Sequence, residues 1–471
     1  MSDHGEHAGQ GYGDDHDHGD GPRGPGGLLR ARGHIGALER NLRGLLLGFL
    51  GIDIVKDPPP HPGHHGEGLP PGIELADHRF GGGYLYKARQ LLVTRDDFNL
   101  VLRLLQDNHI RLAPGEPQPI GGAGLLRVFL HPDEPKLVPE VVSILRAVDI
   151  VDLPAVGISP VHALPALSHP RGYPCDSPRA AGPLDPPPED DDGQPGAGVR
   201  VAVLDSGVAE GHPWLDPRVE WLSANDVEQP QVQNGVLNRF SGHGTFIAGV
   251  VLQCAPGATV VAKNVFDPIG FVDDTQLAAA LNALPADIQV INLSLGGPTH
   301  DNLGLLATEA ALLRLSQRNP RLVVVAAAGN EGATQETYPA AFKNVIAVGA
   351  QQAPGGGRAC FSNHGSWVDA CAMGRRVHST FFEDLDATPE PIPQTCLADP
   401  PPGLQQFQGF ATWSGTSFAA PCVAGAIAAR MTDQNVDAVQ AAFQLVDANG
   451  LPQHPDGDLG TIVTCAGGGV D

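Results

Sequence analysis

Basic residues are scarce in this chain. It has 29 Lys and Arg against 53 Asp and Glu, which gives a formal net charge of −24 over 471 residues. Nucleic acids and anionic membrane surfaces are bound by clustered Lys and Arg, because phosphate groups attract positive charge. The charge balance therefore argues against a nucleic-acid partner and against a membrane partner.

Long hydrophobic runs and paired cysteines are also missing. The most apolar early stretch, Leu45–Val55, is shorter than the ~20 residues that span a bilayer, and the N-terminus has neither the basic nor the apolar region of a secretory signal. The 7 cysteines form no CxxC pair, so a zinc ribbon or thioredoxin-type site is unsupported, and a full disulfide framework is unusual in so large a chain. We expect a soluble, cytoplasmic protein.

Residues 1–82 are rich in Gly, His, Pro and Asp. They predict a low-complexity, disordered segment, because they cannot bury enough apolar surface to offset chain entropy. Only Ala37–Leu50 has apolar residues at helical spacing. Several histidines near the N-terminus lack the spacing of a fixed metal site, so a solvated tail is the better interpretation for them: His4, His7, His16 and His18.

A different pattern begins at residue 83. Segments with apolar residues at i, i+3, i+4 and i+7 predict helices, and short apolar runs predict strands. The predicted order along residues 83–166 is βαββαβ, a small α+β domain of the ferredoxin-like kind, which by itself indicates no function. Residues 167–197 are rich in Pro, Gly and Asp and predict a linker. The predicted elements are strand Tyr84–Thr94, helix Arg95–Asn108, a weaker strand within Ile110–Ile120, strand Leu125–Leu130, helix Pro135–Val148 and strand Ile150–Ile158.

Two short motifs follow the linker. Val199–Leu204 is an apolar, β-branched run, typical of a buried parallel strand, and it leads into Asp205. A carboxylate at the carboxyl end of such a strand lies where open α/β sheets place catalytic groups, although many such aspartates only cap turns. The glycines that flank His243 let other backbone approach its imidazole, and the small residues after it suit a buried helix. That motif alone fits a packed loop histidine equally well.

Two further motifs lie near the end of the chain. Val323–Ala328 predicts another buried strand, and Asn330 follows it after a glycine, where its amide is suited either to donate into a cleft or to form a turn. Ser417 begins a helix of small residues, whose first N–H groups lack intrahelical partners and favour a developing oxyanion. A simple helix cap is the alternative for Ser417.

Together the four motifs resemble those of the subtilisin-like serine proteases, the subtilases. The resemblance covers residues 198–465 and implies a catalytic domain over 198–471, an α/β fold with a mostly parallel sheet and helices on both faces. The matching stretches are VAVLDSGV around Asp205, GHGTFIAGVV around His243, AAAGNEG around Asn330 and GTSFAAPCVAGAIA around Ser417, with weaker support from INLSLGG, TYPAAFKNVIAVGA and FSNHGSWVDACAMG.

The resemblance implies a serine endopeptidase that acts on protein or peptide substrates. Ser417 would be the nucleophile, His243 the general base and acid, and Asp205 the partner that orients the imidazole. The Asn330 side chain and the Ser417 N–H would form the oxyanion hole. Small residues would line the slot for the P1 side chain and favour large apolar residues there. The implied substrate-binding residues are Ser294, Leu295, Gly296, Ala327, Ala328, Gly329 and, near the mouth of the slot, Glu331.

Three features depart from the family pattern. Residues 375–409 look like an insertion before the nucleophile segment, which would narrow or cap the cleft. Secreted subtilases carry export signals, so secretion is the alternative location by family habit. Calcium sites are common in the family, and Asp267, Asp273 and Asp274 are candidates here, but a solvated loop is the simpler interpretation and no metal site is assigned.

The domain that precedes the catalytic motifs has a family counterpart as well. Subtilases commonly carry a βαββαβ pro-domain that assists folding and blocks the cleft, so the resemblance implies that residues 83–166 inhibit the protease in the same chain. Ile158–Leu167 would enter the substrate groove as an added strand, with cleavage near Leu164–Ser168. The alternatives are a permanent accessory domain, or a catalytically silent subtilase-like binding or scaffold module.

Overall fold

The computed structural model describes most of the chain beyond residue 68. By internal contacts the chain divides into two units, residues 1–59 and 60–471, and every described residue lies in the second. The predicted helix at Ala37–Leu50 and the histidine-rich tail therefore lie outside the described residues. The structure describes residues 69, 71–76, 83–121, 124–147, 157–165, 175–185, 193–267, 270–354, 356–391, 396–397, 399–400, 402–448 and 450–465.

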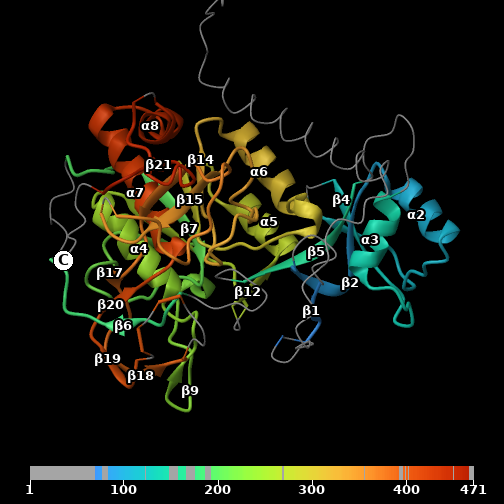
Figure 1. Ribbon diagram of the computed structural model, residues 1–471, viewed down its shortest axis with the longest axis horizontal. Helices are drawn as coiled ribbons and strands as arrows, with labels where there is room; N and C mark the ends of the chain where they lie inside the picture. The colour runs from blue at the N-terminus through green and yellow to red at the C-terminus, as the bar shows by residue number, and fades with distance from the viewer. Residues whose placement is uncertain are drawn as a thin grey trace, which may run out of the picture. The chain divides into compact units, whose positions relative to one another are not determined.

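The first part of the described chain forms an antiparallel sheet with two helices (Figure 1). The sheet order is β5-β2-β4-β3, with β1 beside β2, and these neighbours all run antiparallel. From β2 onward the elements follow the order βαββαβ along the chain. Their bounds are β1 Ile73–Leu75, β2 Leu85–Thr94, α2 Phe98–Asp107, β3 Gln118–Ile120, β4 Leu125–Phe129, α3 Val138–Arg146 and β5 Ile158–Pro165.

Two predictions for this part of the chain are wrong. The sequence predicts disorder for residues 51–82, but Ile73–Leu75 is a strand that pairs with the start of β2. The last strand begins at Ile158, where the predicted strand ends, and runs to Pro165; most of the predicted strand lies outside the described residues. Both strands owe their conformation to pairing with distant neighbours, which a local sequence pattern does not detect.

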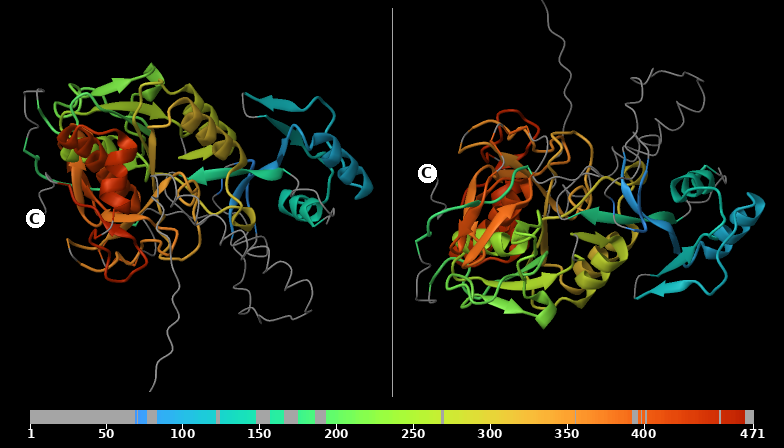
Figure 2. Two further views of the ribbon diagram at one scale, coloured as in Figure 1. Left: turned by 90° about the horizontal axis from the view of Figure 1, so that it is seen from above. Right: turned by 90° about the horizontal axis from the view of Figure 1, so that it is seen from below.

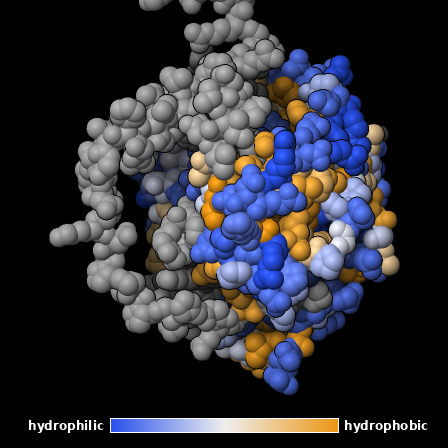
Figure 3. All heavy atoms as spheres, turned by 90° about the vertical axis from the view of Figure 1, so that its right-hand side faces the viewer, coloured by the Kyte–Doolittle hydropathy of each residue, from blue (hydrophilic) through white to orange (hydrophobic). Residues whose placement is uncertain are grey.

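The two faces of this sheet bury different cores. Leu91 and Val93 of β2 pack with α2 and α3, whereas Leu92 between them belongs to another core, because successive side chains of a strand point to opposite faces. Leu92, Val161 and Leu164 share that second core with residues of the domain that follows. Figure 3 looks onto the α2 and α3 side and shows hydrophilic residues over much of the described surface, with apolar residues between them.

Eight parallel strands form the central sheet of the rest of the chain (Figure 1). Their order is β21-β16-β15-β14-β13-β7-β11-β8, and every neighbouring pair is parallel. The inner strands are short runs of small and β-branched residues, as expected where both faces of a sheet are covered. The bounds are β7 Arg200–Asp205, β8 Val219–Trp221, β11 Thr259–Asn264, β13 Val290–Leu293, β14 Val323–Ala327, β15 Ile346–Gln351, β16 Ala370–Met373 and β21 Thr461–Ile462.

Helices cover both faces of this sheet (Figures 1 and 2). The helices α4 (His243–Cys254) and α7 (Thr416–Gln434) share one core, and α5 (Asp274–Ala283) and α6 (Leu306–Arg318) share the other. Close contact between α4 and α7 depends on Gly425, where a Cβ atom would lie 2.6 Å from a side chain of α4. The α/β fold predicted from the sequence is therefore confirmed for this domain.

The predicted insertion and part of the predicted linker are folded. Within residues 375–409, β17 pairs with β20, and β18 pairs with both β19 and β10. The prediction of an unstructured linker is wrong for β6, which pairs with β20. The remaining bounds are β6 Arg179–Ala180, η2 Ala224–Asp226, β9 Val232–Gln233, β10 Val236–Leu237, β12 Phe271–Asp273, η3 His300–Asn302, β17 Val377–Thr380, β18 Leu385–Pro389, β19 Gln405–Phe407, β20 Phe410–Trp413, α8 Ala438–Ala442 and the π-helical turn Phe443–Asp447.

Two disulfides link distant parts of the chain. Cys254 in α4 is bonded to Cys465, and Cys360 is bonded to Cys396 in the insertion. The partners are 211 and 36 residues apart in sequence, so their spacing gives no signal of pairing. Among the described residues, no helix is both long and apolar enough to cross a membrane.

Candidate active site

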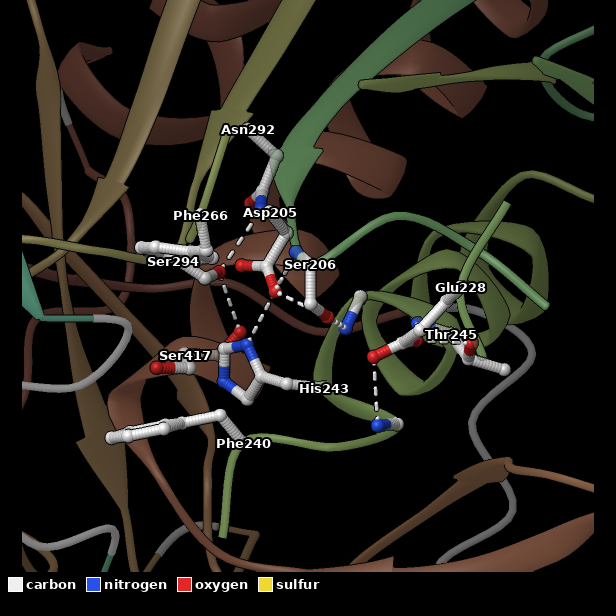
Figure 4. A network of polar contacts seen from close by, with 12 residues as sticks. Asp205, Ser206, Glu228, Phe240, His243, Thr245, Phe266, Asn292, Ser294 and Ser417 are labelled. Carbon is white, nitrogen blue, oxygen red and sulfur yellow. Dashed lines mark hydrogen bonds and ion pairs between the residues drawn. The ribbon is translucent and has the colours of Figure 1, made fainter. Parts of the chain in front are cut away.

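The central sheet and α4 bring the predicted aspartate and histidine together (Figure 4). β7 ends at Asp205, α4 begins at His243, and the Nδ1 atom of His243 lies 2.7 Å from Oδ1 of Asp205. Both side chains are fully buried. The N–H of Ser206 donates to the same carboxylate oxygen at 2.8 Å, which fixes the carboxylate from a second direction. A buried carboxylate in this position orients an imidazole and stabilises its protonated form.

Glycines allow the close approach of backbone at the start of α4. Gly242, at φ 84°, turns the chain into the helix. A Cβ atom on Gly244 would collide with the carbonyl group of Gly207, just beyond the end of β7. The N–H of Gly244 donates to the hydroxyl of Ser206 at 2.8 Å, so the first turn of α4 is tied to the residue that follows Asp205.

The first turn of α7 carries Ser417. The ring of Phe418, the next residue, lies 5.4 Å from the ring of His243 between centroids, and the Trp413 ring lies edge-on to His243 at 5.6 Å. Figure 4 shows Ser417 next to the imidazole. The Ser417 hydroxyl and the Nε2 atom of His243 are both buried, and neither has a hydrogen-bond partner among the described residues. These are the two atoms between which the proton of a nucleophilic serine moves.

Asn330 follows β14 and is tied to the residue before Ser417. Its Oδ1 atom accepts hydrogen bonds from the N–H and the hydroxyl of Thr416, both at 2.9 Å. An amide that accepts through its oxygen presents its NH₂ group on the other side. Thr416 therefore fixes the orientation of the Asn330 amide relative to Ser417.

The predicted substrate-binding residues lie at the carboxyl edge of the parallel sheet. Ser294–Gly296 follow β13 directly, and Ala327–Gly329 span the end of β14; all six residues are buried. The hydroxyl of Ser294 donates to the carbonyl oxygen of Ser417 at 2.8 Å, so the first segment touches the start of α7. Glu331 is partly buried, and its Oε2 atom accepts a hydrogen bond from the Asn363 amide at 2.6 Å.

A sequence model of the subtilase family matches residues 196–443, which is more than half of the chain. The chain belongs to the subtilase family. Subtilisin E of Bacillus subtilis is 34% identical over 250 residues, covering 50% of this chain and 56% of that protein. Subtilisin Savinase of Lederbergia lenta is 35% identical over 247 residues, covering 50% of this chain and 77% of that protein. The chain thus spans little more than half the length of subtilisin E.

The solved structures agree on the fold. Fervidolysin from Fervidobacterium pennivorans, a keratinolytic enzyme related to subtilisin, superimposes with a TM-score of 0.51 at 21% sequence identity. The match covers 81% of this chain and 60% of that one. The family model confirms the family resemblance, and the superposition confirms the subtilisin-like fold predicted from the sequence.

A glutamate that the sequence analysis missed lies beside the Asp–His pair of this subtilase. Glu228 is buried and accepts hydrogen bonds from the N–H of Gly242 at 2.8 Å and from the hydroxyl of Thr245 at 2.5 Å. Burial raises the pKa of its carboxyl group to about 8, although these hydrogen bonds act in the opposite direction. Glu228 therefore holds the start of α4 close to Asp205.

Asn363 is a second functional residue that the sequence analysis did not single out. Its amide NH₂ donates to the carbonyl oxygen of Ala328 at 3.0 Å and to the carboxylate of Glu331, and its Oδ1 atom accepts from the N–H of Glu331. These bonds hold the loop after β14 in place. The weaker family motif FSNHG contains this asparagine, so a signal for it was present in the sequence.

The three calcium candidates act as hydrogen-bond acceptors within the fold. Asp273 caps α5, and Asp267 accepts from the N–H of Phe271 at 2.9 Å. Asp274 is buried and accepts from the N–H of Thr308 at 2.8 Å; burial raises the pKa of its carboxyl group to about 6. All three carboxylates thus hold neighbouring backbone groups in place.

Proposed function

We propose that this subtilase is a serine endopeptidase with Asp205, His243 and Ser417 as its catalytic triad. The observation that carries the proposal is the buried Asp205–His243 pair at 2.7 Å, beside the buried hydroxyl of Ser417 at the start of α7. Three elements that are distant in sequence contribute one residue each. These residue types together support acyl transfer through a serine nucleophile.

The proposed reaction begins with attack by the Ser417 oxygen on the carbonyl carbon of a peptide bond. The hydroxyl proton passes to Nε2 of His243, and Asp205 stabilises the resulting imidazolium. His243 then gives the proton to the leaving amine, so that the C–N bond breaks and an acyl-enzyme is left. Water repeats the sequence with His243 as the base, which releases the carboxylic acid and restores Ser417.

The oxyanion formed in each half-reaction needs fixed N–H donors. We propose that the Asn330 amide and the backbone N–H of Ser417 supply them. The two hydrogen bonds from Thr416 to the amide oxygen support this role, because they orient the NH₂ group. The position of Ser417 supports it too, because N–H groups in the first turn of a helix have no intrahelical acceptor.

The proposed slot for a substrate side chain lies between two segments in which every residue except Leu295 is small. Ser294–Gly296 and Ala327–Gly329 would flank the P1 residue, the one whose carbonyl group is attacked. Their small side chains leave room for a large apolar group, and Glu331 would disfavour an acidic one by charge repulsion. We therefore propose a preference for Leu, Phe or Met at P1.

A peptide library with every residue at P1 tests this function. We expect cleavage after Leu, Phe and Met at rates well above those after Asp and Glu, and we expect a serine-directed fluorophosphonate to stop all cleavage. The measurement is product formation by mass spectrometry, with the inhibitor-treated protein as its matched control. A profile dominated by Asp or Glu would contradict the proposed slot, and cleavage that survives the fluorophosphonate would contradict the serine mechanism.

We further propose that the N-terminal domain, residues 69–165, is a ferredoxin-like pro-domain that inhibits the protease in the same chain. The end of β5 supports the proposal: Ala163, Leu164 and Pro165 pair antiparallel with the three residues of β12, directly before α5. An extended segment that adds a strand to an exposed edge is a recognised mode of peptide binding. This pairing joins the last strand of the N-terminal domain to an edge of the catalytic domain.

Side-chain contacts around this pairing support a specific interface. Leu164 is buried in the core shared with Val272 of β12. The Tyr84 hydroxyl lies 2.6 Å from the Nδ1 atom of His300, and both residues are buried. Arg127 forms an ion pair with Asp273 at 3.7 Å. An apolar contact with polar contacts around it is typical of a protein inhibitor bound to its target.

Separate expression of residues 69–167 and 168–471 tests the inhibition. We expect the first fragment to inhibit the second with a micromolar or lower inhibition constant. Leu164→Asp should weaken inhibition at least tenfold, because it buries an unpaired charge. Leu137→Asp adds the same charge at a side chain that is 50% exposed, so it should leave inhibition unchanged. Absence of inhibition, together with full activity of the uncut chain, would refute the pro-domain role.

A further inference from the structure

A segment upstream of the family match is built into the catalytic domain. Residues 175–185 precede residue 196, where the match to the subtilase family begins. β6 within this segment forms the edge of a sheet by pairing with Ala411 and Thr412 of β20. Cys175 is buried in the core of the catalytic domain, and the hydroxyl of Ser177 donates to the carbonyl oxygen of Glu390 at 3.0 Å.

Asp176 in this segment accepts hydrogen bonds from Trp413 and Ser414, which lie just before Ser417. One oxygen of its carboxylate accepts from the N–H of Ser414 at 2.9 Å, and the other accepts from the Ser414 hydroxyl at 2.7 Å. Its backbone carbonyl oxygen accepts from the indole N–H of Trp413 at 2.9 Å. Trp413 and Ser414 are fully buried, and Asp176 is partly buried.

Of the two residues bonded to Asp176, Ser414 lies close to Ser417 in sequence and Trp413 packs against His243. Ser414 leads through Gly415 and Thr416 to Ser417, and the N–H of Gly415 is itself bonded to a carbonyl oxygen at 2.7 Å. The Trp413 ring packs edge-on against the His243 imidazole at 5.6 Å and in a tilted arrangement against Phe418 at 5.3 Å. A shift of either residue would therefore change the alignment of Ser417 with His243.

We propose that Asp176 is a positioning residue for the nucleophile, and that the segment around it is a permanent part of the active-site framework. The inference rests on the proposed protease function and adds to it a residue from outside the family match. Asp176 touches no reacting atom. It acts by fixing the turn before α7 and the Trp413 ring, which packs against the His243 imidazole. A displacement of catalytic groups by about 1 Å is enough to lower the catalytic rate strongly.

Charged side chains surround Asp176, and we call its hydrogen bonds to Trp413 and Ser414 the clamp. Arg179, Arg376 and Asp399 line a cavity together with Asp176, and Arg376 is paired with Asp399 at 2.7 Å. Burial raises the pKa of the Asp176 carboxyl group to about 6, against the effect of the bonds from Ser414 and the charge of Arg179. At pH 8 the group is ionised and accepts both hydrogen bonds, so an assay at this pH examines the intact clamp.

Kinetics of Asp176→Ala in the full chain at pH 8 test the proposal. We expect kcat to fall about ten- to a hundredfold, the effect of losing a hydrogen bond to a charged group, while KM stays within about twofold. The rate is expressed per active site titrated with a fluorophosphonate, so that unfolded protein is not counted. Asp185→Ala, which removes the same charge from an exposed side chain of the segment, should behave as the wild type.

Two further variants keep the test decisive if Asp176→Ala does not fold. Ser414→Ala removes the hydroxyl that donates to the Asp176 carboxylate, and Asp176→Asn removes the charge of that acceptor. The double variant should lose no more than the more affected single variant, because both changes act on one contact. If the wild type is active and the kcat of every one of these variants lies within twofold of the wild-type value, the positioning role alone is overturned. An inactive wild type would instead refute the protease function.

The clamp also limits where the chain can be cut to give an active enzyme. Cleavage that releases the N-terminal domain must leave Asp176 joined to the catalytic domain. N-terminal sequencing of the active processed protein should therefore give a first residue no later than Asp176. A fully active product that begins after Asp176 would overturn the inference, because it would work without the clamp.

Discussion

Ser417→Ala is expected to lower kcat for peptide hydrolysis about a millionfold, the size of loss seen when the nucleophile of subtilisin is removed. The methyl group cannot attack a carbonyl carbon, and the neighbouring hydroxyl of Ser294 is already committed to the carbonyl oxygen of Ser417. The remaining rate comes from substrate binding and the oxyanion donors alone. Steady-state kinetics on a chromogenic peptide measure the change.

The controls for Ser417→Ala separate chemistry from folding. Labelling by a fluorophosphonate should disappear in this variant, while the melting temperature stays close to that of the wild type, because one buried oxygen without a hydrogen-bond partner is removed. Ser316→Ala removes a hydroxyl at the surface of α6 and should change neither activity nor labelling. Substantial hydrolysis by Ser417→Ala would exclude Ser417 as the nucleophile.

The catalytic domain is predictable from the sequence because its signals are local. β7 and β14 are short apolar runs; β7 ends at Asp205, and Asn330 follows the end of β14 by three positions. His243 and Ser417 begin helices of small residues that are recognisable without any partner. Parallel strands with these ends bring their motifs to one edge of the sheet, so order along the chain is enough to group them.

The supporting residues are not predictable in this way, because their partners are distant in sequence. Glu228 lies in an irregular segment, and its role depends on the donors Gly242 and Thr245. Asp176 lies among prolines and glycines typical of a linker, and only its contact with Ser414, 238 residues later, gives it a role. β1 and β5 are likewise strands because of the strands beside them.

Replacing Asp205 by Ala is expected to lower kcat about ten-thousandfold, close to the loss seen for the triad aspartate of subtilisin. His243 would lose both its acceptor at Nδ1 and the only charge at hydrogen-bond distance from it among the described residues, in a site where both side chains are fully buried. The imidazolium formed during the reaction would then have no countercharge, which is costly away from water. Single-turnover and steady-state kinetics measure the loss.

Asp205→Asn should lose less activity than Asp205→Ala. The N–H of Ser206 donates to Oδ1, the same oxygen that faces His243, so the amide of an asparagine would be held with its oxygen in that position. The imidazole would keep its orientation and tautomer and lose only the countercharge. An asparagine variant as slow as the alanine variant would show that the amide turns its NH₂ group to His243 instead.

The double variant Asp205→Ala/Ser417→Ala tests whether the residues act as one unit. Once the nucleophile is absent, no proton reaches His243, and the countercharge has nothing to stabilise. The double variant should therefore be no slower than Ser417→Ala alone, because the effects of groups that act together are not additive. A further ten-thousandfold loss would mean that Asp205 contributes by a route independent of Ser417, and the proposed triad would be wrong.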